Sequence, residues 1–495
     1  MYFLFTIYAL ALTFIAVYCF SQLLLWLDYR QAKRQSNQNQ QLTLEKAKLS
    51  DDLPFITIQL PIFNEMYVVE RLIDNIVKMN YPKDKFQIHV LDDSTDETVE
   101  ITRKKVAAYH AEGFDIKQIT RTNRQGYKAG ALKEATAQAK GDLIAIFDAD
   151  FLPRPDFLLN TIPYFKNKEV GVVQTRWEHI NKQYSLLTRL QAMQLDVHFT
   201  VEQNGRFVGN SLLQFNGTAG VWRKETIQDA GGWEADTLTE DLDLSYRAQL
   251  KNWKIIYLEA VGSPAELPAE MNGLKSQQFR WMKGGAENAR KNVVRIWKAD
   301  IPLKKKLNGS FHLFNSTVFV AVLVAGLTSV PLVHLLSNKV FVWGQYFLGL
   351  FVVSTLSILL VYYEANVRAS FQQGSYTKRL FTFIGYFPVF LALSMGLCFH
   401  NTVAVLEGWS GKKSAFIRTP KFNIKTFGDS FQKRQYLTQK ISWMTIIEGL
   451  LAVYFLYGFY SGIQLGNTAF LVFHGLLFIG FSTIFFYTIL HLKKG

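Results

Sequence analysis

The chain has 495 residues, of which 49% are hydrophobic and 15% are aromatic, and it carries a formal net charge of +14. This length exceeds one ordinary domain, and only two cysteines are present, so no disulfide framework is expected. The positive charge suggests nucleic acid as a partner, but the basic residues lie mainly beside apolar segments, as in membrane proteins. We therefore expect a membrane protein with no nucleic-acid partner.

Residues 2–27 are almost free of charge and long enough to cross a bilayer, which takes about 20 apolar residues. They lack the basic start and the cleavage site of a signal peptide, so we expect a retained anchor. The polar run at residues 30–48 predicts a linker. Because basic residues follow the anchor, the positive-inside rule places the N-terminus outside and residues 28–307 in the cytoplasm.

Residues 51–297 alternate between strand and helix patterns, which predicts an α/β fold with a mostly parallel sheet. The expected strands are residues 55–60, 86–91, 114–119, 143–147, 170–174 and 253–258. Helices are expected at residues 95–110 and 129–139, and the pattern is irregular around Asn216.

Two pairs of carboxylates follow the second and fourth of these strands. They are Asp92 with Asp93, and Asp148 with Asp150. Open α/β sheets bind ligands at the carboxyl ends of their strands, where the first pair could accept hydrogen bonds from a nucleoside. The second pair suits a hard divalent cation that keeps substrate phosphates among its ligands, which indicates a nucleoside diphosphate held through a metal. Simple capping of the next helix is the alternative for each pair.

Three further motifs carry polar side chains suited to a sugar nucleotide. Lys128 opens a helix, where it could bind phosphate, although a solvated lysine would look the same. Glu240 and Asp241 lie at a helix start, and either carboxylate could act as a general base for a sugar hydroxyl or merely cap the helix. Arg280 and Trp281 lie on a basic amphipathic helix that suits a membrane interface. They could hold a diphosphate and a sugar ring, or snorkel beside the membrane.

The C-terminal part contains four more apolar segments, residues 311–335, 340–363, 441–463 and 469–492. A weaker segment, residues 381–405, is interrupted by Pro388. The loops on both sides of it are basic and should both lie inside. We infer that residues 381–405 lie in the interface or re-enter from the cytoplasmic side, and a sixth crossing is the alternative.

The ordered motifs resemble those of the processive family 2 glycosyltransferases of the cellulose synthase superfamily. The set consists of Asp92-Asp93, Asp148-Ala149-Asp150, Thr239-Glu240-Asp241 and Gln277 to Trp281. The stretches VQTRW (173–177), HFTVEQ (198–203), FNGTAGVWR (215–223) and AGGW (230–233) look like the cellulose synthase-like A and C branches, which make mannan and the glucan backbone of xyloglucan. The resemblance covers residues 55–291 by motif and the membrane part by layout.

This resemblance implies a GT-A type nucleotide-sugar-binding domain inserted between transmembrane helices, and it implies a role for each motif residue. The residues expected to bind the nucleotide sugar are Asp92, Asp93, Lys128, Asp148, Gln277 and Arg280. Those expected to hold Mg²⁺ or Mn²⁺ are Asp150 and Asp148. Asp241 would be the catalytic base, with Glu240 beside it. The residues expected to bind the acceptor are Asn216, Gly217, Thr218 and Trp281. A gating loop of the F-x-V-T-x-K type would contain Phe416, Arg418, Thr419 and Lys421, with Arg418 in place of Val.

The expected layout has five parts. They are an anchor (1–29), a linker (30–50), the GT-A domain (51–272), an interfacial amphipathic helix (273–307) and a C-terminal membrane region (308–495), in which an interfacial stretch and gating-like loop (381–440) separate two pairs of helices.

The implied activity is inverting hexosyl transfer that polymerises a β-linked glucan or mannan and passes it across the membrane. The donor would be UDP-glucose or GDP-mannose, and the acceptor a polysaccharide or a glycolipid. The alternatives are single transfer to a lipid such as ceramide, and a transporter or sensor that merely binds a nucleotide sugar. We expect a multi-pass membrane protein of a bacterial inner membrane rather than the Golgi, with its catalytic domain in the cytoplasm. No feature of the sequence indicates whether the protein is a monomer or an oligomer.

Overall fold

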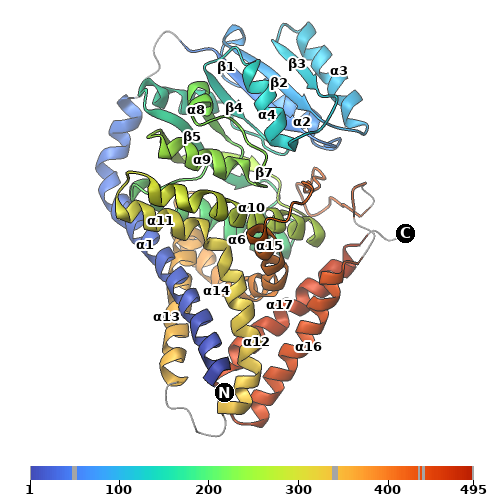
Figure 1. The fold of residues 1–495 in the computed structure, drawn as a ribbon. Helices are drawn as coiled ribbons and strands as arrows, with labels where there is room; N and C mark the ends of the chain where they lie inside the picture. Colours follow the sequence, from blue (N-terminus) through green and yellow to red (C-terminus); the bar gives the residue numbers. More distant parts are fainter. Residues whose placement is uncertain (1, 47–52, 337–343, 433–434, 438–440, 493–495) are drawn as a thin grey trace.

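The computed structural model describes residues 2–46, 53–336, 344–432, 435–437 and 441–492. An α/β domain lies above a group of long helices, and α10 (Met271–Lys298) and α11 (Leu303–Leu313) run crosswise between these two parts (Figure 1). The N-terminus lies at the end of the helical part that is farthest from the α/β domain.

One mixed sheet forms the centre of the α/β domain. Its strands are β1 (Ile56–Ile62), β2 (Phe86–Asp92), β3 (Ile116–Thr120), β4 (Leu143–Ile146), β5 (Val170–His179), β6 (Gly220–Arg223) and β7 (Lys254–Ala265). Their spatial order is β3-β2-β1-β4-β6-β5-β7. β1 pairs in parallel with β2 and β4, β2 with β3, and β5 with β7, whereas β6 is antiparallel to β4 and β5. The carboxyl ends of β1 to β4 therefore share one edge of the sheet.

Both faces of the sheet are buried because helices cover them. In β4, Leu143 and Ala145 pack into one hydrophobic cluster, and Ile144 and Ile146 pack into another on the opposite face. Burying one such aliphatic side chain contributes about 1.5–3 kcal/mol. The near-continuous apolar runs of the sequence follow from this two-sided burial.

The helices of the α/β domain lie between these strands. They are α2 (Val69–Ile76), α3 (Thr98–Ala111), α4 (Tyr127–Ala137), α5 (Phe157–Thr161), α6 (Leu186–Val197), α7 (Gln203–Val208), α8 (Lys224–Asp229) and α9 (Glu240–Leu250). Shorter turns are η1 (Lys83–Lys85), η2 (Ile162–Lys166) and the π-helical η3 (His198–Glu202).

Two features of the sheet differ from the expectation. β6 was not predicted, because it has only four residues and follows the irregular stretch around Asn216. β5 and β7 are longer than expected, because their pairing continues past a bulge as far as His179 and Ala265. This extension brings Glu266, which follows β7, to the edge of the sheet that carries Asp150.

The remaining helices form the membrane part. They are α1 (Tyr2–Lys46), η4 (Asn315–Thr317), α12 (Val318–Leu336), α13 (Gly344–Tyr363), η5 (Glu364–Arg368), α14 (Tyr376–Gly396), α15 (Cys398–Ser410), α16 (Trp443–Gln464), η6 (Thr468–Phe470) and α17 (Leu471–Leu490). The polar run that was expected to be a linker is helical as far as Lys46, since its Gln, Lys, Leu and Glu residues are good helix formers. Part of the expected segment 340–363 lies outside the described residues.

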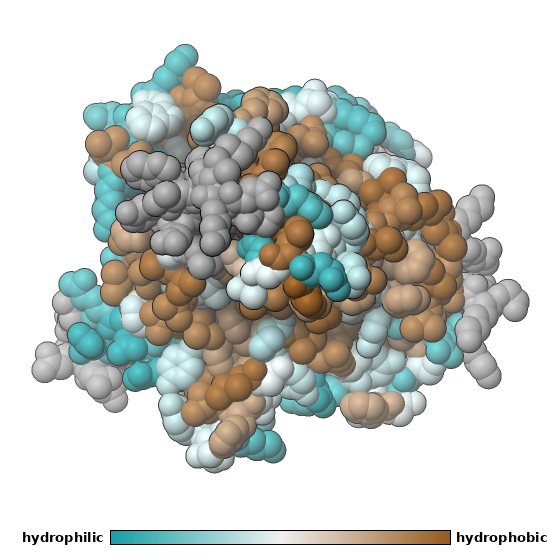
Figure 2. Space-filling view, turned by 90° about the horizontal axis from the view of Figure 1, so that it is seen from below, coloured by the Kyte–Doolittle hydropathy of each residue, from teal (hydrophilic) through white to brown (hydrophobic). Residues whose placement is uncertain are grey.

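Six helical segments among the described residues are long and apolar enough to cross a membrane. They are Tyr2–Arg34, Asn315–Leu335, Gly349–Arg368, Tyr376–Gly396, Trp443–Gln464 and Thr468–Leu490. Large apolar side chains are exposed on them, including Val353, Leu450, Val453, Val472 and Phe486. Seen from below, this end of the molecule has an extensive apolar surface (Figure 2). The protein is therefore a multi-pass membrane protein.

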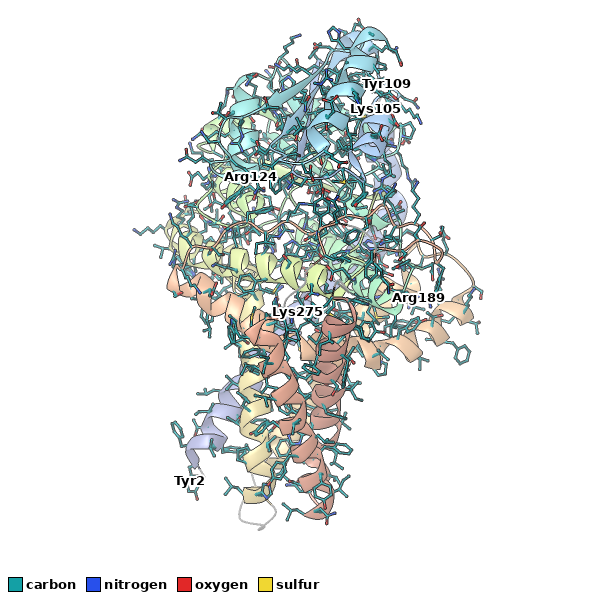
Figure 3. The ribbon with its side chains drawn as sticks, turned by 90° about the vertical axis from the view of Figure 1, so that its right-hand side faces the viewer. Tyr2, Lys105, Tyr109, Arg124, Arg189 and Lys275 are labelled. Atoms are coloured by element: carbon teal, nitrogen blue, oxygen red, sulfur yellow. The ribbon has the colours of Figure 1, made fainter. Side chains whose placement is uncertain are left out.

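The stretch expected in the interface forms two helices: α14, which contacts α6 of the α/β domain, and α15, which contacts α10. Arg189 of α6 donates to the Tyr386 hydroxyl at 2.5 Å, and the His400 imidazole donates to the Lys275 carbonyl of α10 at 2.9 Å. In Figure 3, Arg189 and Lys275 mark the level at which the domain meets the membrane part. A helix as long as α14 extends about 30 Å, so a helix crossing the bilayer would reach the domain at one end only.

Candidate active site

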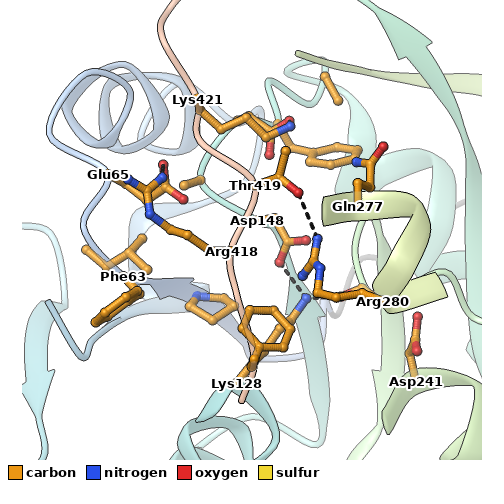
Figure 4. Close-up of a pocket in the computed structure, with 18 of the residues that line it drawn as sticks. Phe63, Glu65, Lys128, Asp148, Asp241, Gln277, Arg280, Arg418, Thr419 and Lys421 are labelled. Atoms are coloured by element: carbon orange, nitrogen blue, oxygen red, sulfur yellow. Dashed lines mark hydrogen bonds and ion pairs between the residues drawn. The ribbon is translucent and has the colours of Figure 1, made fainter. Parts of the chain in front are cut away.

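A cleft with a volume of about 190 Å³ opens at the carboxyl ends of β1, β2 and β4. Its other walls come from α9, α10 and the segment that follows α15. Figure 4 shows Lys128, Asp148, Asp241 and Arg280 converging on it from separate elements. The expected site residues that line the cleft are Asp93, Lys128, Asp148, Asp150, Asn216, Gly217, Glu240, Asp241, Gln277, Arg280, Trp281, Phe416, Arg418, Thr419 and Lys421.

Lys128 connects Asp148 and Gly217 at the centre of the cleft. It lies in the first turn of α4, two residues after the N-cap residue Gly126, whose φ is 71°. Its Nζ donates to Asp148 Oδ1 at 2.5 Å and to the Gly217 carbonyl at 2.9 Å. Burial alone would lower the pKa of Lys128, but the Asp148 and Glu240 carboxylates outweigh burial and raise it. Lys128 therefore stays cationic, as phosphate binding requires.

Asp150 is the second carboxylate at the end of β4. Its Oδ2 accepts from Lys421 Nζ at 2.6 Å and from the Glu266 N–H at 3.1 Å. Asp148 Oδ2 and Asp150 Oδ1 accept no hydrogen bond from any described residue. Two available carboxylate oxygens in a cleft suit Mg²⁺ or Mn²⁺ together with phosphate oxygens, so these residues fit the expected metal.

A second acidic group lies outside the cleft. Glu234, Asp236 and Asp243 come close enough to hold a cation. Lys291 already fills the space between them, because its Nζ donates to Glu234 at 2.6 Å and to Asp236 at 2.7 Å. This group is therefore an ion-pair network and not a metal site.

Asp241 and Glu240 begin α9 and face the cleft from the side opposite β1. Asp241 Oδ1 accepts from the Leu242 N–H at 2.9 Å. Its Oδ2 points toward Gly217, where an added Cβ would lie 3.0 Å away, so a side chain at Gly217 would crowd the carboxylate. Burial and the neighbouring Glu240 raise the pKa of Asp241 to about 7, against the lowering effect of Lys128. Burial also raises the pKa of Glu240.

The start of α9 is fixed against α10. Asn288 donates from Nδ2 to the Thr239 carbonyl at 3.1 Å and to Thr239 Oγ1 at 3.0 Å. Gly284 allows this approach, because a Cβ there would lie 2.5 Å from Thr239 Oγ1. Helix α10 thus positions Asp241 while it also supplies Gln277, Arg280 and Trp281 to the cleft.

Arg280 connects α10 to the segment after α15. It donates to Thr419 Oγ1 at 3.1 Å, and its guanidinium lies 4.5 Å from the centre of the Phe416 ring. Burial lowers the pKa of Arg280, and the carboxylates of Asp148, Glu240 and Asp241 oppose this effect. The guanidinium is therefore held close to several negative groups.

We call residues 416–432 the strap, because they run from the region after α15 up to the α/β domain (Figure 1) and several of them line the cleft. Its far part is anchored by Phe422, Ile424 and Phe431, which are buried in one cluster with Ala269. Nearer the cleft, Arg418 pairs with Glu65 at 3.1 Å. Burial raises the pKa of Glu65 to about 8, although Arg418 lowers it.

Asp92 and Thr218 do not line the cleft, so their expected binding roles stay predictions. Asp92 is 2% exposed, and it accepts from the Ser94 N–H at 2.9 Å and from Gln118 Nε2 at 2.7 Å. Thr218 is fully buried, and its Oγ1 accepts from the Asp148 N–H at 2.8 Å. Both side chains point inward from the sheet edge, so they shape the loops that carry Asp93 and Asp148.

Several residues that line the cleft were not predicted. Glu65 follows the end of β1 by three residues, and the rule that ligands bind at strand ends could have found it. Glu266 follows a strand that is longer than expected. Arg124 and His179 reach the cleft through loop and strand geometry that gives no local sequence signal.

Residues 54–284 match the family model described as "Glycosyltransferase like family 2". Probable glucomannan 4-beta-mannosyltransferase 7 of Oryza sativa subsp. japonica is 41% identical over 287 residues, which are 57% of this chain and 49% of that protein. Glucomannan 4-beta-mannosyltransferase 1 of Cyamopsis tetragonoloba is 40% identical over 299 residues, which are 59% of this chain and 56% of that protein.

The chain spans about half the length of the curated relatives it matches. Among solved structures, mannosyltransferase PcManGT from Pyrobaculum calidifontis, in complex with GDP-Man and Mn²⁺, is similar with a TM-score of 0.52 and 19% identity, covering 82% of this chain and 100% of that chain. This likeness concerns the fold, and it agrees with the mixed sheet described above. The expected fold, a GT-A type α/β domain flanked by apolar helices, is confirmed. Residues 54–284, slightly less than half of the chain, are thus similar to family 2 glycosyltransferases, and the sequence is similar to plant glucomannan 4-beta-mannosyltransferases.

Proposed function

We propose that the protein is an inverting hexosyltransferase that builds a β-linked polysaccharide of the mannan type from a nucleotide sugar. The observation that carries this proposal is the buried Asp241, with a pKa of about 7, in the same cleft as Lys128, Asp148 and Arg280. A base with a pKa near the working pH is well matched to accept a hydroxyl proton.

The donor lies with its diphosphate beside Lys128, Arg280 and the carboxylates of Asp148 and Asp150. A divalent metal held by these two carboxylates would neutralise charge on the leaving diphosphate. Asp241 takes the proton from the acceptor hydroxyl while that oxygen attacks the anomeric carbon. Single displacement inverts an α-linked donor into a β-linked product. Trp281, which lines the cleft, stacks on the terminal acceptor sugar, with Asn216 and Gly217 beside it.

A growing polymer explains the architecture better than single transfer to a lipid. The cleft lies next to α10, which rests directly on the membrane helices, so a product can leave toward the bilayer. The names of the relatives, glucomannan mannosyltransferases, also favour a polysaccharide over a ceramide product. GDP-mannose is therefore our first choice of donor, and UDP-glucose is the competitor that an assay must include.

We further propose that the expected layout holds, with the N-terminus outside, the α/β domain in the cytoplasm, and α14 and α15 lying in the cytoplasmic interface. The contacts of Tyr386 with α6 and of His400 with α10 support this topology. The two relatives named above come from plants, so they do not support the expectation of a bacterial inner membrane.

The test uses the full chain, purified in detergent with Mn²⁺, and compares GDP-mannose with UDP-glucose by nucleotide release and product analysis. We expect a ladder of β-linked mannose oligomers, and Asp241→Asn should not produce it. A lipid carrying one sugar would replace this proposal with the single-transfer alternative. Nucleotide binding without any transfer would favour a sensor or transporter.

A further inference from the structure

The cleft has two distinct ends on either side of Lys128 and Asp148. Figure 4 shows Phe63 on one side of this pair and Asp241 on the other. Because the reacting sugar must lie within reach of Asp241, the nucleoside must extend the opposite way, toward the ends of β1, β2 and β3. Phe63 follows β1, Asp93 follows β2, and Arg124 follows β3, and all three line the cleft. This end therefore contacts the base.

The Arg124 guanidinium contacts two aromatic rings. Its Cζ lies 3.2 Å from the centre of the Phe63 ring and 4.9 Å from that of Tyr127. Its Nε is buried without a hydrogen-bond partner, and the guanidinium forms no hydrogen bond or ion pair with any described residue. Figure 3 labels Arg124 on the α/β domain, well above the membrane junction at Lys275. A stacked guanidinium with unused donors in a ligand cleft has its hydrogen-bonding edge available for a ligand.

Asp93 supplies acceptors next to these donors. Its carboxylate is held by Arg121, whose Nε lies 2.9 Å from Oδ1 and whose Nη2 contacts Oδ2, and both side chains are less than 8% exposed. A carboxylate accepts about four hydrogen bonds in all, so Asp93 keeps capacity after pairing with Arg121. Arg121 also donates to the Tyr127 carbonyl at 2.9 Å, which fixes the turn that carries Arg124.

We propose that Arg124 and Asp93 select a guanine base in the donor, an inference that rests on the proposed function. Guanine presents two acceptors, O6 and N7, to an arginine, and its N1–H and N2–H donors lie on the adjoining edge, where a carboxylate can accept them. Uracil lacks the N7 acceptor, and adenine presents an amino donor where guanine has O6. The pair Arg124 and Asp93 thus matches guanine and neither of the other bases.

The test measures nucleotide binding by calorimetry on the full chain in detergent with Mn²⁺. We expect GDP to bind about 5- to 150-fold more tightly than UDP, the range of one bidentate arginine–guanine contact. 7-Deaza-GDP, which lacks N7, should bind more weakly than GDP to the parent protein. Arg124→Met should remove this difference, because the methionine keeps the apolar stacking and has no donors. Inosine diphosphate, which lacks the 2-amino group facing Asp93, should bind more weakly to both proteins.

Arg103→Met is the matched control, because Arg103 is exposed and pairs with Glu100 away from the cleft. It should bind every nucleotide like the parent. Equal affinity for GDP and UDP, or a 7-deaza-GDP penalty that persists in Arg124→Met, would overturn the base assignment and leave the proposed function standing. Failure to bind either nucleotide would instead remove the proposed function itself.

Discussion

The raised pKa of Asp241 predicts a defined acid limb in the pH profile of transfer. A carboxylate must be deprotonated to act as the base, and burial with Glu240 raises the pKa of Asp241 to about 7. At pH 6 only about a tenth of the enzyme then carries the active form, and at pH 5 about a hundredth. We therefore expect kcat/KM to fall about tenfold per pH unit below 7.

Acid unfolding would also lower the activity, but the pKa shift of Asp241 does not destabilise the fold at low pH. The pKa of Asp241 is raised in the fold from its ordinary value of 3.8. The stabilisation from this carboxyl is therefore fully present below pH 3.8 and is lost as the pH rises through about 7. Its titration does not destabilise the fold on the acidic side, so the lost activity should return when the pH is raised again.

Two variants assign the limb to one carboxylate. Asp241→Asn should lower the rate by about 10²- to 10⁴-fold and abolish the limb. Glu240→Gln should move the limb to lower pH, because Glu240 raises the pKa of Asp241. The assay is nucleotide release at saturating acceptor between pH 5 and 8.5. A flat profile, or activity of Asp241→Asn within tenfold of the parent, would refute the role of Asp241. If the limb disappears in Glu240→Gln instead, Glu240 is the base.

Three further predictions concern the metal, the strap and the topology. Chelation with EDTA and Asp150→Ala should each stop turnover, and full turnover in excess EDTA would contradict a metal at Asp150. Replacing Phe416 and Thr419 by Ala should lower transfer strongly while donor hydrolysis stays level or rises. Hydrogen exchange of the strap should slow when GDP and metal are added. If the double variant synthesises product at the parental rate and GDP does not change hydrogen exchange in the strap, the strap is an ordinary linker. Single cysteines at Gln373 and Lys425, in a protein whose native cysteines are buried, should react with the same side-specific reagent from the cytoplasm, and labelling from opposite sides would mean that α14 crosses.

The first half of the sheet could be read from the sequence because its signal is local. The apolar runs that became β1, β2 and β4 are buried on both faces, and the acids at their ends mark the turns that follow. β6 gave no such signal. Its four residues are held as a strand by β4 and β5 on either side, so its structure depends on tertiary pairing.

The residues of the site likewise divide into those with a local sequence signal and those placed by tertiary structure. Asp148, Asp241 and Arg280 were expected from their motifs, and the structure brings them to one cleft. Periodicity could not show that Asp92 points inward and Asp93 toward the cleft, because neighbouring strand residues face opposite ways and a turn follows immediately. Nor could it reveal Arg124, whose stacking on Phe63 joins loops that are far apart in the sequence.

The strap joins the two ends of the cleft. Phe416 stacks on Tyr127, with ring centres 5.9 Å apart, and also lies against Arg280. Tyr127 in turn flanks Arg124 at the nucleoside end. Docking of the strap and binding of a nucleotide are then thermodynamically linked, and each must strengthen the other by the same factor. Loosening the distant anchor, for example by Phe431→Ala, should therefore weaken nucleotide affinity in proportion to the fraction of molecules whose strap is undocked, although Phe431 itself does not line the cleft.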